Sequence, residues 1–334
     1  MENSILMRTL GSTALLYLVC AGISAQEAAP VSGPILGFVA DASSGVRPII
    51  GIPGAATLGS ALLSTTQAEN VVFSTGRDYA LALLAPDRRV ALFRDLRTAP
   101  SVADLPAPPG AGRLAVSPSG NAAVLYYPEA GAVAVLNGLP DSPALSWSTA
   151  APQLTAELAA LAVADGGGGI LLASGQRSPV WLIRPDGGPQ VLSYVAASPS
   201  LAFLPSSLDA LIADGGASTV TLARDVEGSI RLTQVGGPAE GVSNPVAVVA
   251  SADGRNALVA NSEPAGVVTL SLGGGESSLV PCNCRVTALE PLSGGAAFRV
   301  NQPGDGPIWL LDAAVSPPRM VFVPESLAVQ QGGE

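Results

Sequence analysis

The feature that most constrains this sequence is a small-residue turn that recurs about every 44 residues. Successive turns are separated by 44, 48, 39, 47 and 40 residues, and they are centred at Gly76, Gly120, Gly168, Ser207, Gly254 and Gly294. Each turn joins two short apolar segments, and further short segments follow before the next turn. Four strands fit into a repeat of this length, whereas solenoid coils are usually shorter, so the period predicts a β-propeller rather than a β-solenoid.

Residues 245–272 show the repeating unit most clearly. Apolar and polar residues alternate over three short segments, which are joined by turns at 251–254 and 263–266. Such alternation between Gly, Pro and Asp residues is typical of half-buried antiparallel strands. A fourth, outer strand completes each repeat, as at residues 319–323. We name the strands of a blade a to d, from the central channel outward.

Complete repeats start near residues 70, 112, 158, 199, 245 and 285. The N-terminal segment 35–53 matches the c–d hairpin at 308–324, because both contain two apolar strands around an Asp-containing turn. We therefore expect hairpin 35–53 to close the last blade as its c and d strands, with 326–330 as an inner strand. Joining the termini in one blade hides the edges of an open sheet. This predicts seven four-stranded antiparallel blades, and six blades with an added hairpin is the alternative.

Residues 1–25 predict a secretory signal peptide, with cleavage before Gln26. Arg8 precedes an apolar run at 10–23, and the small residues Ser24 and Ala25 follow it. The run is too short for a membrane span, and no later stretch is long and apolar enough for one. We expect one propeller domain over 26–334, monomeric and exported to the periplasm or the medium.

Composition narrows the possible partners. Hydrophobic residues make up 48% of the chain and charged residues 13%, which excludes global disorder. The net charge is −10 and no basic run occurs, which excludes nucleic acid and anionic lipid as partners. A protein or a component of the cell envelope is the partner that we expect.

Two missing residue types exclude most enzyme chemistry. The sequence contains no His, and every one of its 16 basic residues is Arg. Nucleophile systems that need His, the common zinc, copper and haem sites, and Schiff-base chemistry lose their usual groups. We predict no catalytic residue, no cofactor and no transition-metal site. Carboxylate pairs, Tyr or an oxygen-bound Ca²⁺ are the options that remain.

The expected b–c turns carry a charged residue in nearly every repeat. They share one face of a propeller with the d–a connections, around the mouth of the channel. We predict that this ring binds a ligand or Ca²⁺, although turns are also polar simply because they are solvated. Its members are Asp87, Arg88, Glu129, Arg177, Asp214, Glu263 and Asp305.

Cys282 and Cys284 are separated by one residue. In an extended strand their Cα atoms would lie about 6.6 Å apart, at about 3.3 Å per residue, which is the upper limit for a disulfide. The pair can close in an oxidising compartment if the chain bends. A structural bridge, two free thiols and a redox pair remain open.

The repeat can be compared with a known family. Segment 246–272, VAVVASADGRNALVANSEPAGVVTLSL, resembles the repeat of secreted bacterial YVTN-type β-propellers, and 114–136 resembles it nearly as well. The resemblance covers about residues 71–323 and implies a seven-bladed fold and a secreted binding role. Such propellers include surface-layer proteins, lactonase-like enzymes and subunits of quinone- or haem-dependent dehydrogenases. This chain lacks the His residues and basic clusters that most of those enzyme sites use.

Two functions follow as hypotheses. The first is an exported, non-catalytic propeller that binds a protein or envelope partner through one face. The alternative is a carboxylate- or Ca²⁺-dependent enzyme, such as a lactonase-like hydrolase, with its site at the channel mouth.

Overall fold

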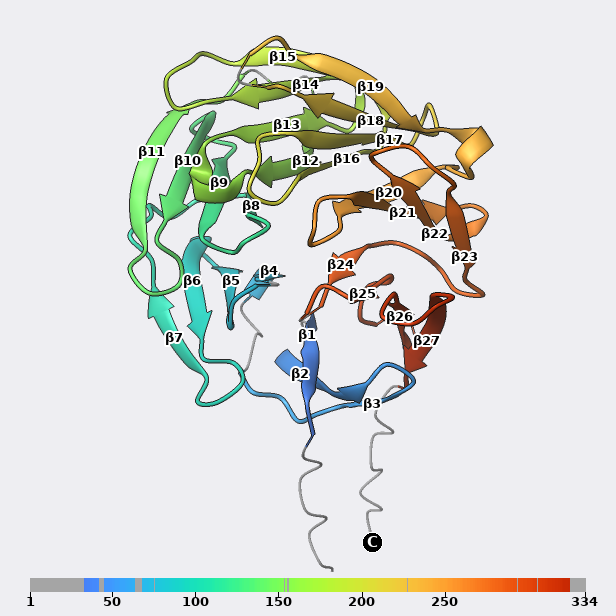
Figure 1. Ribbon diagram of the computed structural model, residues 1–334. Helices are drawn as coiled ribbons and strands as arrows, with labels where there is room; N and C mark the ends of the chain where they lie inside the picture. Colours follow the sequence, from blue (N-terminus) through green and yellow to red (C-terminus); the bar gives the residue numbers. More distant parts are fainter. Residues whose placement is uncertain are drawn as a thin grey trace, which may run out of the picture. The chain divides into compact units, whose positions relative to one another are not determined.

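The computed structural model describes residues 33–41, 45–63, 68–74, 76–152, 154, 156–226, 228–292, 294–304 and 306–324. These residues form one compact unit. The described residues contain seven antiparallel sheets and two short 3₁₀ helices. Figure 1 shows the sheets following one another in chain order around a central axis. The predicted seven-bladed β-propeller is therefore confirmed, and the six-bladed alternative is wrong. The predicted signal peptide lies outside the described residues.

The first three sheets come from the N-terminal part of the chain. The first contains β1 (Ile35–Asp41), β2 (Gly45–Ile52) and β3 (Ala55–Leu58). The second contains β4 (Ala68–Phe73), β5 (Tyr79–Leu84), β6 (Arg89–Arg94) and β7 (Ser101–Asp104). The third contains β8 (Arg113–Val116), β9 (Ala122–Tyr127), β10 (Ala132–Asn137) and β11 (Ala144–Ala150).

Two further blades follow in the middle of the chain. The fourth contains β12 (Leu158–Val163), β13 (Ile170–Ser174), β14 (Gln176–Ile183) and β15 (Gln190–Ala197). The fifth contains β16 (Pro199–Phe203), β17 (Ala210–Asp214), β18 (Thr219–Arg224) and β19 (Arg231–Gly236). The 3₁₀ helices are η1 (Asp165–Gly167) and η2 (Pro238–Glu240).

The last two blades complete the ring. The sixth contains β20 (Pro245–Ala250), β21 (Asn256–Ser262), β22 (Ala265–Ser271) and β23 (Ser278–Pro281). The seventh contains β24 (Glu290–Pro291), β25 (Ala297–Arg299), β26 (Ile308–Asp312) and β27 (Arg319–Val323). In these and the other four-stranded sheets the strands pair in the order a, b, c, d.

The core lies between neighbouring blades. Strands b and c of each blade are apolar on both faces, and every residue of β5 and β13 is buried. Leu81 and Leu83 of the second blade share one cluster with Leu125 and Leu136 of the third. Burial of each such side chain stabilises the folded protein by about 1.5–3 kcal/mol. Stability therefore comes from contacts between successive blades rather than from any sheet alone.

The prediction for the N-terminal hairpin was wrong in part. Residues 35–53 form a closing blade together with β3, separate from the sheet of β26 and β27, but they are not the c and d strands of that blade. Its strand β1 takes the inner position, because Gly37 and Phe38 line the central cavity and Phe38 packs on Phe73 of β4, with ring centroids 6.0 Å apart. This sheet contacts both neighbours, so the hairpin does close the ring, as a blade of its own. The predicted inner strand 326–330 lies outside the described residues.

Candidate functional site

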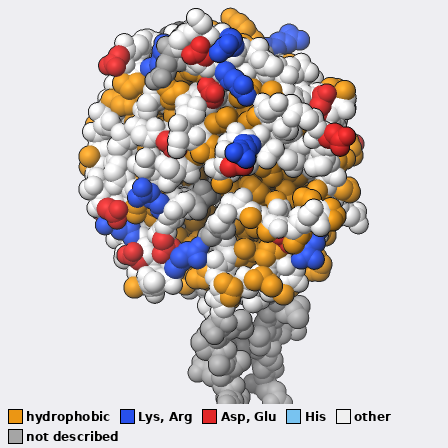
Figure 2. All heavy atoms as spheres, in the orientation of Figure 1, with side chains coloured by type: hydrophobic (Ala, Val, Ile, Leu, Met, Phe, Trp, Pro, Cys, Tyr) orange, Lys and Arg blue, Asp and Glu red, His pale blue; other side chains and the backbone are white. Residues whose placement is uncertain are grey.

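A cavity of about 340 Å³ lies on the propeller axis. Residues of the inner strands of all seven blades line it, and the lining continues to a–b turn residues such as Pro118, Pro205 and Ala252. Because strand b joins the a–b turn at one end and the b–c turn at the other, these two sets of turns lie on opposite faces. The cavity therefore reaches the a–b face. Figure 2 shows hydrophobic side chains gathered around the hollow centre of the molecule.

One position on the inner strands distinguishes the seventh blade from the others. Two residues before the a–b turn, five blades place a small apolar side chain in the cavity wall: Val72, Ala115, Ala162, Ala202 and Val249. Their cross-strand partners are apolar as well: Leu81, Val124, Leu171, Leu211 and Leu258. The seventh blade places Glu290 at this position, opposite Arg299. Among the described residues that line the cavity, Glu290 is the one with a charge.

Glu290 lines the cavity and is paired with Arg299 behind it, which is not among the described lining residues. Arg299 Nη2 donates to Glu290 Oε2 at 2.5 Å. The Arg299 side chain is only 6% exposed, whereas that of Glu290 is 47% exposed. Arg299 Nη1 also donates to Asn301 O and to Gln302 Oε1. The buried guanidinium thus holds the carboxylate in place while leaving it accessible to a ligand.

A charged pair at this position needs an explanation. Removing two charges from water costs several kcal/mol, and an apolar pair of similar volume is often at least as stable. The same position is apolar in the five other blades that can be compared, so the fold itself does not require the pair. This makes Glu290 a candidate binding residue. Sequence reasoning missed it, although aligning the repeats on their turns would have revealed a lone acid in a row of apolar residues.

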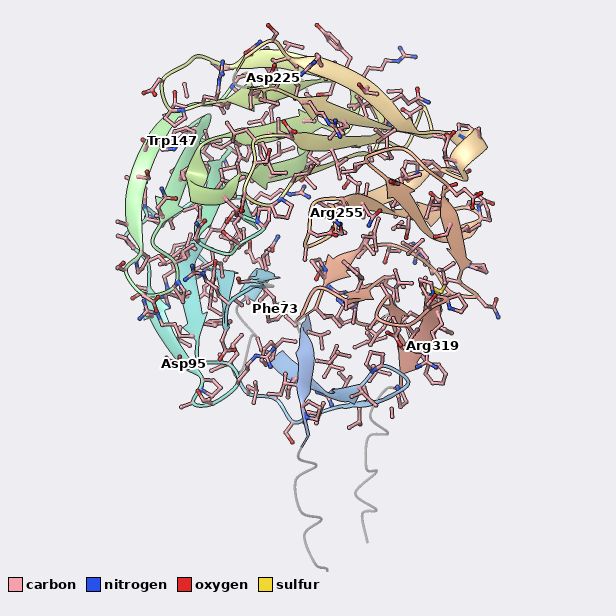
Figure 3. The ribbon with its side chains drawn as sticks, viewed as in Figure 1. Phe73, Asp95, Trp147, Asp225, Arg255 and Arg319 are labelled. Atoms are coloured by element: carbon pink, nitrogen blue, oxygen red, sulfur yellow. A yellow bond between two sulfur atoms is a disulfide. The ribbon has the colours of Figure 1, made fainter. Side chains whose placement is uncertain are left out.

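Aromatic side chains line the mouth of the cavity. Phe73 on β4 and Phe203 on β16 lie one residue nearer to the a–b turns than the position that is equivalent to Glu290. Figure 3 shows Phe73 and Arg255 beside the central opening, whereas Asp95, Trp147, Asp225 and Arg319 lie at the periphery. The wall between the a–b face and Glu290 is therefore mostly apolar, and Arg255 lies beside its opening.

Asp165 organises one side of this mouth. Its Oδ1 accepts a hydrogen bond from the backbone N–H of Ser119 at 2.7 Å, and its Oδ2 accepts one from that of Ser206 at 2.8 Å. Those residues directly follow Pro118 and Pro205, which line the cavity. Burial acts to raise the pKa of the Asp165 carboxyl, but the hydrogen bonds from Ser119 and Ser206 outweigh it and hold the pKa below its ordinary value. One carboxylate thus fixes the a–b turns of three successive blades.

The predicted ring of b–c residues lies away from the cavity, and none of its described members lines it. Asp87, Arg88, Glu129, Arg177 and Glu263 are exposed at or beside b–c turns. Arg88 pairs with Glu69 at 3.0 Å, and Asp305 lies outside the described residues. Ligand binding by this ring stays a prediction.

Asp214 differs from the other members of that ring because it is buried, with 8% exposure. Its carboxylate accepts hydrogen bonds from four backbone N–H groups, those of Ala196, Ala197, Gly216 and Ala217. These four hydrogen bonds show that the Asp214 side chain caps backbone N–H groups at the b–c turn.

Cys282 and Cys284 are joined by a disulfide. Their Cα atoms lie 5.1 Å apart, closer than in an extended strand, because the chain bends between β23 and β24. Cys282 belongs to the cluster between the sixth and seventh blades. The bridge therefore fixes the d–a connection at this blade boundary.

Within the described part of the chain, no three His, Cys, Asp or Glu side chains gather closely enough to hold a metal ion. The Ca²⁺ site of the enzyme alternative stays a prediction. No helix among the described residues has the length and apolar character needed to cross a membrane.

Comparison with known proteins adds information on the fold only. No family model and no curated protein matches this sequence. A solved protein from Lactobacillus plantarum is 16% identical, with a TM-score of 0.57 over 87% of this chain and 96% of its own. A Bacteroides uniformis protein, described provisionally as a 6-phosphogluconolactonase, is 14% identical, with the same TM-score and coverage. A functionally unknown protein from Desulfotomaculum acetoxidans is 14% identical, with a TM-score of 0.51 over 74% of this chain and 78% of its own. At such identities the likeness shows the propeller fold alone.

Proposed function

We propose that this chain is an exported, non-catalytic β-propeller that binds a protein or cell-envelope partner at its central cavity. One observation carries the proposal: the inner strands form a mostly apolar cavity in which Glu290, braced by a buried Arg299, is the only charged residue among the described lining residues. A mostly apolar, concave site with few polar groups is the usual form of a binding pocket. The resemblance of the repeats to secreted YVTN-type propellers supports the same role.

The chemistry of the cavity favours binding over turnover. The chain has no His and no Lys, and hydrolysis by carboxylates ordinarily uses two of them around the reacting bond. The cavity wall offers one. The lactonase-like alternative has fold likeness on its side, and the test below separates the two functions.

The test uses a substitution that fills the cavity and measures how much partner the protein retains. Ala115→Phe should remove space from the cavity wall, so we expect at least a tenfold loss of the partner retained from a cell-envelope extract by the immobilised wild-type chain. Val102→Phe is the matched control, because Val102 is 53% exposed on outer strand β7. Equal retention by Ala115→Phe and wild type would contradict the proposal. Turnover of sugar lactones that Ala115→Phe abolishes would instead support the hydrolase.

Export has a separate readout. The protein recovered outside the cytoplasm should begin at Gln26, as measured by intact mass. Recovery of chains beginning at Met1, in the cytoplasm alone, would contradict it.

A further inference from the structure

The carboxylate of Glu290 has room for one more hydrogen-bond donor. Arg299 is bonded to Oε2, and no other described donor reaches the carboxylate. A partner group that fills the cavity expels water from this carboxylate. A desolvated acceptor without a donor costs about 1–3 kcal/mol, and more when it is charged. The bound group must therefore bring a donor to Oε1.

The wall of the cavity selects the charge of that group. Among the described residues that line the cavity, Glu290 is the single charged one and none is basic. Arg299 offsets the charge of Glu290 from the Oε2 side, so an anion that approaches Oε1 is repelled mainly by the near oxygen. A cation gains a charge-assisted hydrogen bond, which is about twice as strong as a neutral one.

The bracing Arg299 further selects the shape of the cation. A guanidinium binds a carboxylate best through two parallel hydrogen bonds, which require both oxygens. Because Arg299 is already bonded to Oε2, a second guanidinium that used both oxygens would have to share that oxygen with a like charge, whereas Oε1 has no described donor. An ammonium is compact and needs only one acceptor here.

The depth of the carboxylate fits a lysine side chain. Glu290 lies two residues before Leu292, where the a–b turn begins. At about 3.3 Å per residue, the backbone of Glu290 is therefore about 6.6 Å below the turn. The wall between them carries apolar side chains, including Phe73, Val116, Val163 and Phe203. A lysine buries its methylene stem along such a surface and places its ammonium at the far end.

Resting on the function proposed above, we infer that the cavity receives a lysine side chain of the partner protein, with its ammonium bonded to Glu290. A tethered group suits the site because the cavity continues to exposed a–b turn residues such as Ala252, on which the rest of the partner can lie.

The test compares capped Gly-Gly-X-Gly-Gly peptides by NMR titration of the mature protein. We expect the lysine peptide to bind at least tenfold more tightly than peptides with norleucine, acetyl-lysine or arginine. Glu290→Gln, which keeps an oxygen for Arg299, should lower affinity for the lysine peptide about tenfold and leave the norleucine peptide unchanged. Glu276→Gln is the matched control, because Glu276 is an exposed turn residue outside the cavity.

Equal binding of the lysine and acetyl-lysine peptides to the wild type would overturn the inference, even if Glu290→Gln failed to fold. Tighter binding of the arginine peptide, or equal affinity for free butylamine, would overturn it as well. If no peptide binds but the partner from the envelope extract still depends on Ala115, the lysine inference fails and the proposed binding function stands. If Ala115→Phe leaves partner binding unchanged, both the lysine inference and the proposed binding function at the cavity are contradicted.

Discussion

Deletion of residues 33–63, which removes the first blade, is expected to convert the propeller into an aggregating chain without a cooperative melting transition. Val46 and Ile49 of β2 are fully buried, and they pack into two different clusters. One cluster is shared with the second blade and the other with the seventh. Removing the blade opens the ring and exposes the apolar faces of both neighbours, and large exposed apolar patches promote aggregation.

Light scattering after size exclusion, together with thermal unfolding, measures this result. Ile49→Ala is the graded comparison: it should remain monomeric and lose about 2–5 kcal/mol, the usual cost of truncating a fully buried Ile. A deletion variant that stays monomeric with an unchanged melting curve would show that the ring does not depend on this blade.

Asp165→Ala is expected to lower the free energy of unfolding by about 2 kcal/mol at neutral pH. The substitution removes an acceptor that serves the N–H groups of Ser119 and Ser206, on the blades to either side. A hydrogen bond to a charged group contributes about 1.5–3 kcal/mol, and we discount the sum because this carboxylate is partly solvated. Denaturant unfolding of the two proteins gives the difference.

The same carboxylate predicts a pH dependence. The pKa of Asp165 is lowered in the folded protein, so its contribution is complete above the ordinary Asp pKa and is lost as the pH falls below about 4. The stability difference between wild type and Asp165→Asn should therefore shrink in acid. Glu129→Gln is the control, because Glu129 is exposed on a b–c turn. A wild-type to Asp165→Asn difference that is constant between pH 7 and pH 3 would contradict the role assigned to the charge.

The architecture could be predicted because its signals are local. Turns at Gly120 and Gly254 require a left-handed backbone, with φ of 71° and 68°, and the adjoining strands alternate. Each repeat carries these signals, so the period and the blade count were readable without knowing any contact.

The position of the N-terminal hairpin within its blade could not be predicted from its local sequence. Segments 35–53 and 308–324 have similar apolar patterns, but a pattern does not show whether a strand lies at the channel or at the rim. Contacts around the ring decide this, such as that between Phe38 and Phe73. The bonds from Asp165 to two other blades likewise join residues 41 and 46 positions away.

The site was misjudged for a different reason. Polar residues at b–c turns drew attention because they are charged, yet Arg88 is paired with Glu69, and Asp214 caps backbone groups. Glu290 was less conspicuous as a single acid near a proline. What identifies it is its position on the inner strand, which is equivalent to that of Ala115 and Ala202 in two other blades, where the residue is apolar.

Site-specific photo-crosslinking tests the central claim most directly, because it reports which face the partner contacts. A benzophenone side chain at Ala252, on the exposed mouth of the cavity, is compared with one at Glu129 on the opposite face. The account predicts a partner adduct from position 252 that Ala115→Phe abolishes, and none from position 129. An adduct formed from position 129 alone would contradict it and move the binding site to the b–c turns.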